Sequence, residues 1–259
     1  MDLQRHLPSP NLKPFLRDIL FIESDKATRN LILPDTSLVL AIRYKGSVSH
    51  TVDGVNRSLP PATLSGLRLS PRHIQYAAAA ANLLIRFEPG GAAAFFTEPL
   101  QEFFQESVPA ADLQGYPSLN SIAAQLAEMT TNTQRATFIQ QFLLTQLKTS
   151  APDPLLRSAI QSIQMAKGTL PIKELAKQLF ISQDAFEKRF RKTVGITAKH
   201  FSSVVRLRHI IDTYTPEKEH TLTHIAHSAG YFDQAHFSHD FQRFTGQPPR
   251  QFFATANYW

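Results

Sequence analysis

The clearest structural pattern in this chain lies at positions 230–241, which read GYFDQAHFSHDF. Gly230 is a typical residue to end a helix, and Asp233 is a typical N-cap, because its carboxylate can accept a hydrogen bond from a free backbone N–H. Phe237 and Phe241 are four residues apart and therefore share one face of the helix that follows. The pattern predicts a helix, a tight turn and a second helix whose apolar face is buried.

The same pattern occurs a second time, further upstream. The matching positions are Leu175-Ala176, Phe186, Phe190 and Gly195 in the first copy and Ile225-Ala226, Phe237, Phe241 and Gly246 in the second. The offset is 50 residues before the turn and 51 after it, because the second turn is one residue longer. A short helix, a turn and a longer helix make a helix-turn-helix, so the chain is predicted to hold two of them.

Prolines, glycines and the N-cap residues Ser182, Thr221 and Asp233 divide the rest of the C-terminal part into helices. We expect them at 155–167, 171–180, 182–195, about 198–213, 221–230 and 233–246, with a final helical turn after Pro248-Pro249. The helix over 198–213 joins the two units and is about 24 Å long at ~1.5 Å per residue. Such a spacer can place two recognition helices about 34 Å apart, in successive major grooves of one duplex.

Composition and charge narrow the class of protein. Of 259 residues, 42% are hydrophobic and 19% charged, which is typical of a globular protein. There is no cysteine, so thiol nucleophiles and Cys-ligated metals are excluded. The net charge is +6, and residues 151–259 carry 14 basic and 9 acidic side chains, which favours a polyanionic partner. No apolar run is long enough for a membrane span, and the polar N-terminus does not look like a secretory signal. We therefore expect a cytoplasmic protein.

The polar faces of the two longer helices are the candidate DNA-reading surfaces. They carry Gln183, Asp184, Glu187, Lys188 and Arg191 in the first copy and Gln234, Ala235, His239, Gln242 and Arg243 in the second. Glutamine can bridge adenine N6 and N7, lysine can reach guanine acceptors, glutamate can accept from cytosine N4, and alanine can pack on a thymine methyl. An ordinary solvated helix face has a similar composition, so this alternative stays open.

The N-terminal part is predicted to be β-rich. Short apolar runs at 31–33, 38–42, 48–52 and 81–87 alternate with turn signals, which favours a small sandwich or partial barrel. Amphipathic helices are expected at 118–129 and 133–147. The second carries a stripe of Phe138, Phe142, Leu143 and Leu147, which either packs on the barrel or forms a dimer contact. The extended segment Thr149–Pro154 divides the chain into domains at 1–150 and 151–259.

Residues 230–241, with Gly246, Pro249 and Phe252, closely resemble the signature of the AraC/XylS-type transcriptional regulators. The resemblance covers about 155–254, with a weaker first motif at Ile172–Gly195. It implies an all-α, seven-helix domain with two helix-turn-helix units that binds double-stranded DNA. It also implies a role in transcription initiation together with RNA polymerase, more often as an activator.

The resemblance also assigns roles by position. Asp184, Glu187 and Lys188 match base-facing sites of the first recognition helix, and Gln234, Ala235 and His239 match those of the second, while Gln183 lies on the same exposed face. The natural phosphate contacts are Arg191, Lys192 and Arg243. Two departures stand out: His239 occupies a position where the family usually has arginine, and the first helix is unusually acidic.

Residues 31–35 and 84–92 resemble an uncharacterised N-terminal domain found in some AraC-type regulators. The resemblance implies a cupin-like unit that senses an effector or forms a homodimer. Its candidate ligand pocket consists of Arg43, Tyr44, Tyr76, Arg86 and Phe87, although the aromatics fit a core role as well. The predicted β-rich region between residues 31 and 87 holds only His50 and His73, and His220, His224 and His227 lack a metalloprotease motif, so we expect no metal and no cofactor.

The favoured hypothesis is a sequence-specific transcriptional regulator controlled by a small molecule through its N-terminal domain. A second hypothesis keeps DNA binding but gives the N-terminal domain only a role in dimerisation or protein contact. A third, an enzyme fused to a helix-turn-helix module, is disfavoured because no acid–base constellation or nucleophile motif is found.

Overall fold

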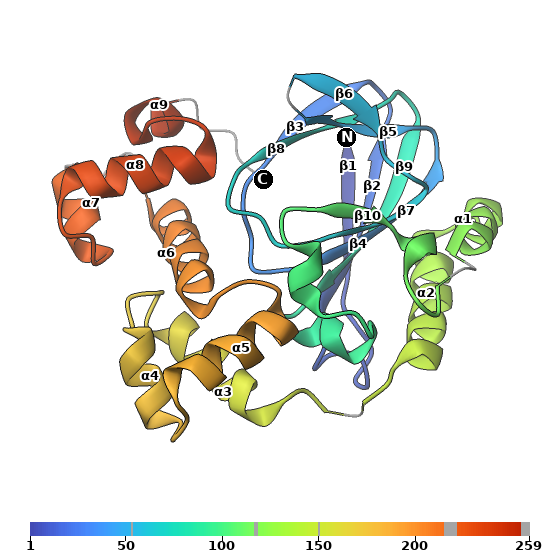
Figure 1. The fold of residues 1–259 in the computed structure, drawn as a ribbon. Coiled ribbons are helices and arrows are strands. Elements are labelled where there is room, and N and C mark those ends of the chain that lie inside the picture. The colour runs from blue at the N-terminus through green and yellow to red at the C-terminus, as the bar shows by residue number, and fades with distance from the viewer. Residues whose placement is uncertain (53, 117–118, 150, 215–221, 255–259) are drawn as a thin grey trace.

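The computed structural model describes residues 1–52, 54–116, 119–149, 151–214 and 222–254. Figure 1 shows a β-rich N-terminal part, with helices α1 and α2 on one side of it and helices α3 to α9 on the other. The fold class predicted from sequence is confirmed: a β-rich part with added helices is followed by an all-α part. No helix among the described residues is long and apolar enough to span a membrane.

Two antiparallel sheets make up the β-rich part within the described residues. The first sheet has the order β1 (Asp2–His6), β2 (Leu16–Ser24), β9 (Ala80–Phe87), β4 (Val39–Lys45), β7 (Ala62–Ser65) and β10 (Ser107–Pro109). The second has the order β3 (Thr28–Ile32), β8 (Arg72–Tyr76), β5 (Val48–Val52) and β6 (Val55–Ser58). Figure 1 shows the strands curving around a common centre, as the partial-barrel prediction requires.

The central strands of the first sheet present two different faces. On β9, Leu83, Ile85 and Phe87 are fully buried in the main core, and Leu40 of β4 lies directly opposite Ile85. The alternate residues point to the other face, because side chains alternate along a strand. One face of this sheet therefore belongs to the core and the other faces the second sheet.

Helices α1 (Leu119–Glu128) and α2 (Asn132–Gln146) cover the core face of the first sheet, together with three short helices. These short helices are η1 (Gly91–Ala94), η2 (Leu100–Phe103) and η3 (Ala110–Asp112). On α2, Leu143 is fully buried, and Phe138, Phe142 and Leu147 pack against the core. The packing interpretation of this stripe is confirmed.

Seven helices follow among the described residues. They are α3 (Pro154–Met165), α4 (Ile172–Gln178), α5 (Gln183–Val194), α6 (Ala198–Thr213), α7 (Leu222–Ser228), α8 (Gln234–Thr245) and α9 (Pro249–Ala254). The predicted N-caps are confirmed: the Ser182 side chain accepts from the N–H of Ala185, and that of Asp233 from the N–H of His236. Thr221, the predicted cap of α7, and His220 lie outside the described residues.

The turns of the two helix-turn-helix units are built alike. In each, the second residue after the helix donates to a carbonyl three residues back, and the next residue donates to one five residues back. These bonds run from Phe180 to Lys177, Ile181 to Ala176, Gly230 to His227 and Tyr231 to Ala226, at 3.0, 3.1, 3.0 and 2.9 Å. Phe180 and Gly230 are thus equivalent positions, with φ of +53° and +73°. The internal repeat read from sequence is therefore also a structural repeat.

The helical part packs against the β-rich part at both of its units. Phe186 and Phe190 of α5 share the main core with Leu100 of η2. The second unit has its own core, in which Phe241 and Phe244 of α8 are joined by Leu33, which follows β3. The helix α6 contributes residues to both cores, so it joins the two units and also meets the N-terminal part.

Candidate nucleic-acid interface and ligand cavity

The first recognition helix, α5, presents most of its predicted DNA-facing residues to solvent. Gln183, Asp184 and Lys188 are exposed, and so are the two predicted phosphate-binding residues, Arg191 and Lys192. None of these five side chains forms an ion pair within the described residues. They lie at the start and along the outer face of the helix, where a groove-binding helix contacts DNA.

Glu187 differs from its neighbours on α5. It is half-buried, and its Oε2 accepts a hydrogen bond of 3.1 Å from the backbone N–H of Ala198, the first residue of α6. A carboxylate at a helix N-terminus is favourable because it meets free N–H groups and the positive end of the helix dipole. In this structure Glu187 therefore stabilises the start of α6, a role that the sequence reading did not assign to it.

The second recognition helix, α8, also presents its predicted residues to solvent. Gln234, Ala235 and His239 are exposed. The Oε1 atom of Gln234 accepts a hydrogen bond of 2.8 Å from the hydroxyl of Thr223 on α7, which orients the amide at the start of α8. Arg243 is exposed but lies 3.3 Å from a carboxylate oxygen of Asp240, so its charge is partly compensated.

A cavity of ≈ 230 Å³ lies between the two sheets, on the face of the first sheet opposite the core. Tyr76 and Arg86 line it, as predicted for a ligand pocket, and Arg43 lines an adjoining cavity of ≈ 100 Å³. The other two predicted pocket residues lie elsewhere. Tyr44 donates a hydrogen bond of 3.1 Å to Glu23 on the core side, and Phe87 is fully buried in the core.

The physical reason for this correction is the alternation of side chains along a strand. Arg43 and Tyr44 are neighbours on β4, and Arg86 and Phe87 are neighbours on β9, so one member of each pair must point away from the cavity. The same rule points to Arg72, which is four residues before Tyr76 on β8 and lines the cavity with it. Arg72 was missed by sequence, although the alternation from Tyr76 was a sufficient signal.

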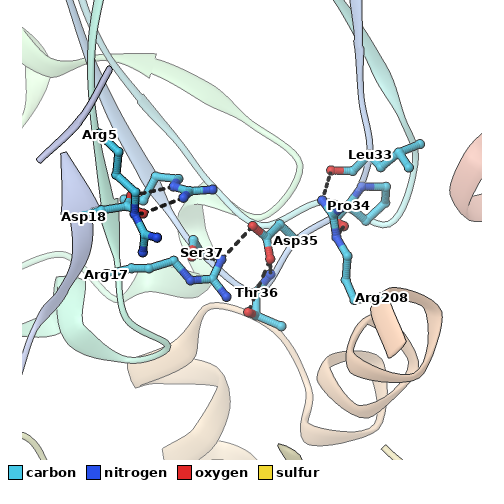
Figure 2. A network of polar contacts seen from close by, with 10 residues as sticks. Arg5, Arg17, Asp18, Leu33, Pro34, Asp35, Thr36, Ser37 and Arg208 are labelled. Atoms are coloured by element: carbon cyan, nitrogen blue, oxygen red, sulfur yellow. Dashed lines mark hydrogen bonds and ion pairs between the residues drawn. The ribbon is translucent and has the colours of Figure 1, made fainter. Parts of the chain in front are cut away.

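Arg86 is held in place by a buried carboxylate. Its Nε and Nη2 donate to the two oxygens of the fully buried Asp18, at 2.7 and 2.6 Å. Arg5 adds a third contact to Asp18, at 2.7 Å (Figure 2). Because a forked arginine–carboxylate pair fixes both groups in orientation, Arg86 is a rigid part of the wall.

The loop 33–37, between β3 and β4, connects the cavity wall to α6. Arg208 of α6 donates to the carbonyl oxygens of Pro34 at 2.7 Å and of Leu33 at 3.2 Å (Figure 2). In the same loop, Arg17 donates to a carboxylate oxygen of Asp35 at 2.9 Å. Arg208 also lines the cavity, and no sequence signal identifies it, because it lies more than 170 residues from the loop that it contacts.

The electrostatics of this loop favour an ionised Asp35. Burial alone would raise the pKa of its carboxyl group, but the positive charges of Arg208 and Arg17 and the N–H of Thr36 together hold that pKa below its usual value. Asp35 therefore stays negative near neutral pH, and it links the two arginines across the boundary between the β-rich part and α6.

The histidines do not come together in a metal-binding cluster in the part of the chain that the structure describes. Among them, His224 and His227 are exposed on α7. His50 and His73 lie on neighbouring regions of the second sheet, and burial together with nearby arginines lowers the pKa of each.

Comparison with known proteins gives two family matches. Residues 175–255 match a family described as a helix-turn-helix domain, and residues 4–109 match a domain of unknown function, DUF6597. Uncharacterized HTH-type transcriptional regulators of Staphylococcus aureus strains MSSA476 and MRSA252 are each 34% identical over 85 residues. The match covers 32% of this chain and only 11% of the length of those relatives.

Solved structures give two further similarities. ToxT from Vibrio cholerae O395 is 12% identical with a TM-score of 0.45, over 92% of this chain and 96% of that chain. The C-terminal domain of AraT, a response regulator from Geobacillus stearothermophilus, is 25% identical with a TM-score of 0.38, over 41% of this chain and 89% of that chain.

Proposed function

We propose that this chain is a sequence-specific transcriptional regulator of the AraC type that reads two half-sites of one DNA duplex, a proposal supported by the match of residues 175–255 to a helix-turn-helix family. In this proposal the domain boundary lies at 150/151, and the β-rich domain controls DNA binding through a small molecule held in its cavity. Such a regulator acts on chromosomal DNA in the cytoplasm and influences RNA polymerase.

The observation that supports this function best is the duplicated recognition unit. Two turns with the same hydrogen-bond pattern each lead into a capped helix, α5 or α8, whose outer face is polar and exposed. A protein that only needed a folded helical domain would have no reason to repeat this arrangement. On α5, Lys188 can reach guanine acceptors, and on α8, Gln234 can bridge adenine N6 and N7.

The cavity supports the ligand-controlled version of this proposal over the alternative in which the N-terminal domain only dimerises. Apolar walls with a few oriented polar groups are typical of small-molecule sites, and the loop 33–37 contacts both the cavity and α6. A domain with only a dimerising role would need neither feature.

The test begins with selection of DNA sites from genomic fragments by the full-length protein. The proposal expects an enriched site with two half-sites about one helical turn apart and an affinity that falls steeply as salt rises. Lys188→Ala and Gln234→Ala should each relax the base preference of one half-site. Lys26→Ala, which removes an exposed charge from the β-rich part, is the matched control and should leave both preferences intact. Selection without any enriched site would overturn the proposal, provided that residues 151–259 alone also select none.

A further inference from the structure

The cavity between the sheets has an unbalanced set of charges. Four arginines line it: Arg68, Arg72, Arg86 and Arg208. Asp35 is the acidic residue among the described lining residues, and it is already paired with Arg17. The remaining walls are largely apolar, with Leu20, Ile22 and Leu84 among them.

Two of these arginines already have strong partners and two do not. Arg86 is neutralised by Asp18, and Arg208 donates to backbone carbonyls beside Asp35. Arg68 and Arg72 form no ion pair within the described part of the chain. Their hydrogen-bond partners are hydroxyl groups: Arg72 donates to Ser107 at 2.7 Å and to Ser65 at 3.1 Å, and Arg68 donates to Ser107 at 3.2 Å.

Placing two guanidinium groups together without a carboxylate is unfavourable, because each loses part of its hydration and repels the other. Consistent with this, burial and the charge of Arg68 lower the pKa of Arg72 to about 10. The Nε atom of Arg68 is buried and has no hydrogen-bond partner. Glu106, an exposed residue, acts on Arg68 only through a longer-range attraction. Among the described residues, no carboxylate therefore neutralises this pair of guanidinium groups at close range.

The geometry points to a ligand that supplies the negative charge: we propose that the cavity binds a small organic anion with an apolar body, and that Arg72 and Arg68 hold its anionic group. This rests on the proposed function in that the ligand is the effector of the regulator. Planar guanidinium donors match the oxygens of a carboxylate or a phosphate, and the apolar walls match the apolar body of the ligand. The cavity, at ≈ 230 Å³, is small for a ligand site, so the ligand must be small.

Binding can be tested on the full-length protein without DNA, by calorimetry and thermal unfolding with a matched set of probes. Octanoate and octyl phosphate carry the two candidate anionic groups, octanamide is the neutral counterpart, and inorganic phosphate lacks the apolar body. We expect at least one alkyl anion to bind ten-fold or more tightly than octanamide and inorganic phosphate. Whichever of the two alkyl anions binds more tightly identifies the anionic group. Equal binding of the charged and neutral alkyl probes, or no binding of either alkyl anion, would overturn the proposal.

The role of Arg72 is tested with Arg72→Gln, which removes the charge and keeps a shorter polar side chain with N–H donors. The proposal expects a loss of anion affinity of at least ten-fold, while the ligand-free variant melts at the same or a higher temperature. A purely structural arginine would instead give a lower melting temperature and unchanged anion affinity, which would contradict the proposal. Arg57→Gln on the exposed strand β6 is the control and should change neither quantity. DNA selection is measured without the anion. A failure of anion binding would therefore overturn this inference without bearing on the DNA-binding proposal.

Discussion

The turn of the first helix-turn-helix unit contains a residue type that its backbone disfavours. Phe180 adopts a φ of +53° and its side chain is 98% exposed, whereas the equivalent residue in the second unit, Gly230, has a φ of +73°. A bulky side chain in the left-handed region is an outlier, because its Cβ crowds the following carbonyl oxygen. We predict that Phe180→Gly stabilises the protein.

The size of the effect follows from two opposing terms. Relief of the left-handed backbone is worth about 1–2 kcal/mol, and the greater freedom of glycine in the unfolded chain costs about 0.4–1 kcal/mol. The ring is almost fully exposed, so its removal loses little packing. With both terms at the middle of their ranges, the net expectation is a gain of about 0.8 kcal/mol in the free energy of unfolding.

The measurement is urea unfolding of the full-length protein, followed by helical circular dichroism. Phe180→Gly should raise the midpoint without changing the m-value. Phe180→Ala separates the backbone from the ring, because it removes the ring and keeps the Cβ, and it should be close to neutral. Gly230→Ala should destabilise, since it adds a Cβ at positive φ that would lie 3.2 Å from Cγ2 of Thr169. If Phe180→Gly and Phe180→Ala behave alike, the reasoning from backbone strain is refuted.

Three further substitutions test the polar contacts of the structure. Asp18→Asn should lower stability by about 2–3 kcal/mol in urea unfolding, because Arg86 loses a buried carboxylate, with some compensation from partial exposure to water. Glu187→Gln should cost about 0.3–1 kcal/mol by removing a charge from the helix start at Ala198, and its selected DNA sites should match those of the parent; altered sites would instead assign it to base reading. The pKa of Asp35 is lowered in the folded protein. The ionised carboxylate therefore stabilises the fold fully above the ordinary pKa of 3.8, and this stabilisation is lost as pH falls below that value. In acid unfolding, the free energy of unfolding of Asp35→Asn should fall less steeply with decreasing pH than that of the parent.

The helical part could be predicted closely from sequence because its signals are local. Caps, prolines and glycines fix where each helix starts and ends, and the predicted range 198–213 coincides with α6. The hydrogen bond of Glu187 shows what such local signals do not predict. The spacing of Glu187 on α5 puts it on the polar face, but its hydrogen bond to Ala198 depends on how α6 leaves the following turn.

The class of the β-rich part follows from the sequence, but only part of the lining of its candidate ligand cavity does. Tyr76 and Arg86 line the cavity, whereas Tyr44 and Phe87 lie elsewhere, because strand neighbours point to opposite faces. Arg208 could not have been found in this way. It reaches the cavity from a helix of the other part of the chain, and only the packed fold brings these segments together.

Under the proposed function, the position of α6 offers a route from the N-terminal cavity to the second recognition helix. Its first half joins the core of the first unit through Phe201, and its second half joins the core of the second unit through Leu207. Arg208, next to Leu207, is bonded to the loop that forms one cavity wall. Under the proposed function, a ligand that displaced this loop would act on the half of α6 that shares a core with α8, while the half that follows α5 would stay in the main core. Hydrogen bonds to a charged group contribute about 1.5–3 kcal/mol. If the ligand broke the hydrogen bonds of Arg208, the proposal expects DNA affinity to change by roughly ten- to a hundred-fold, since each 1.4 kcal/mol is about a factor of ten.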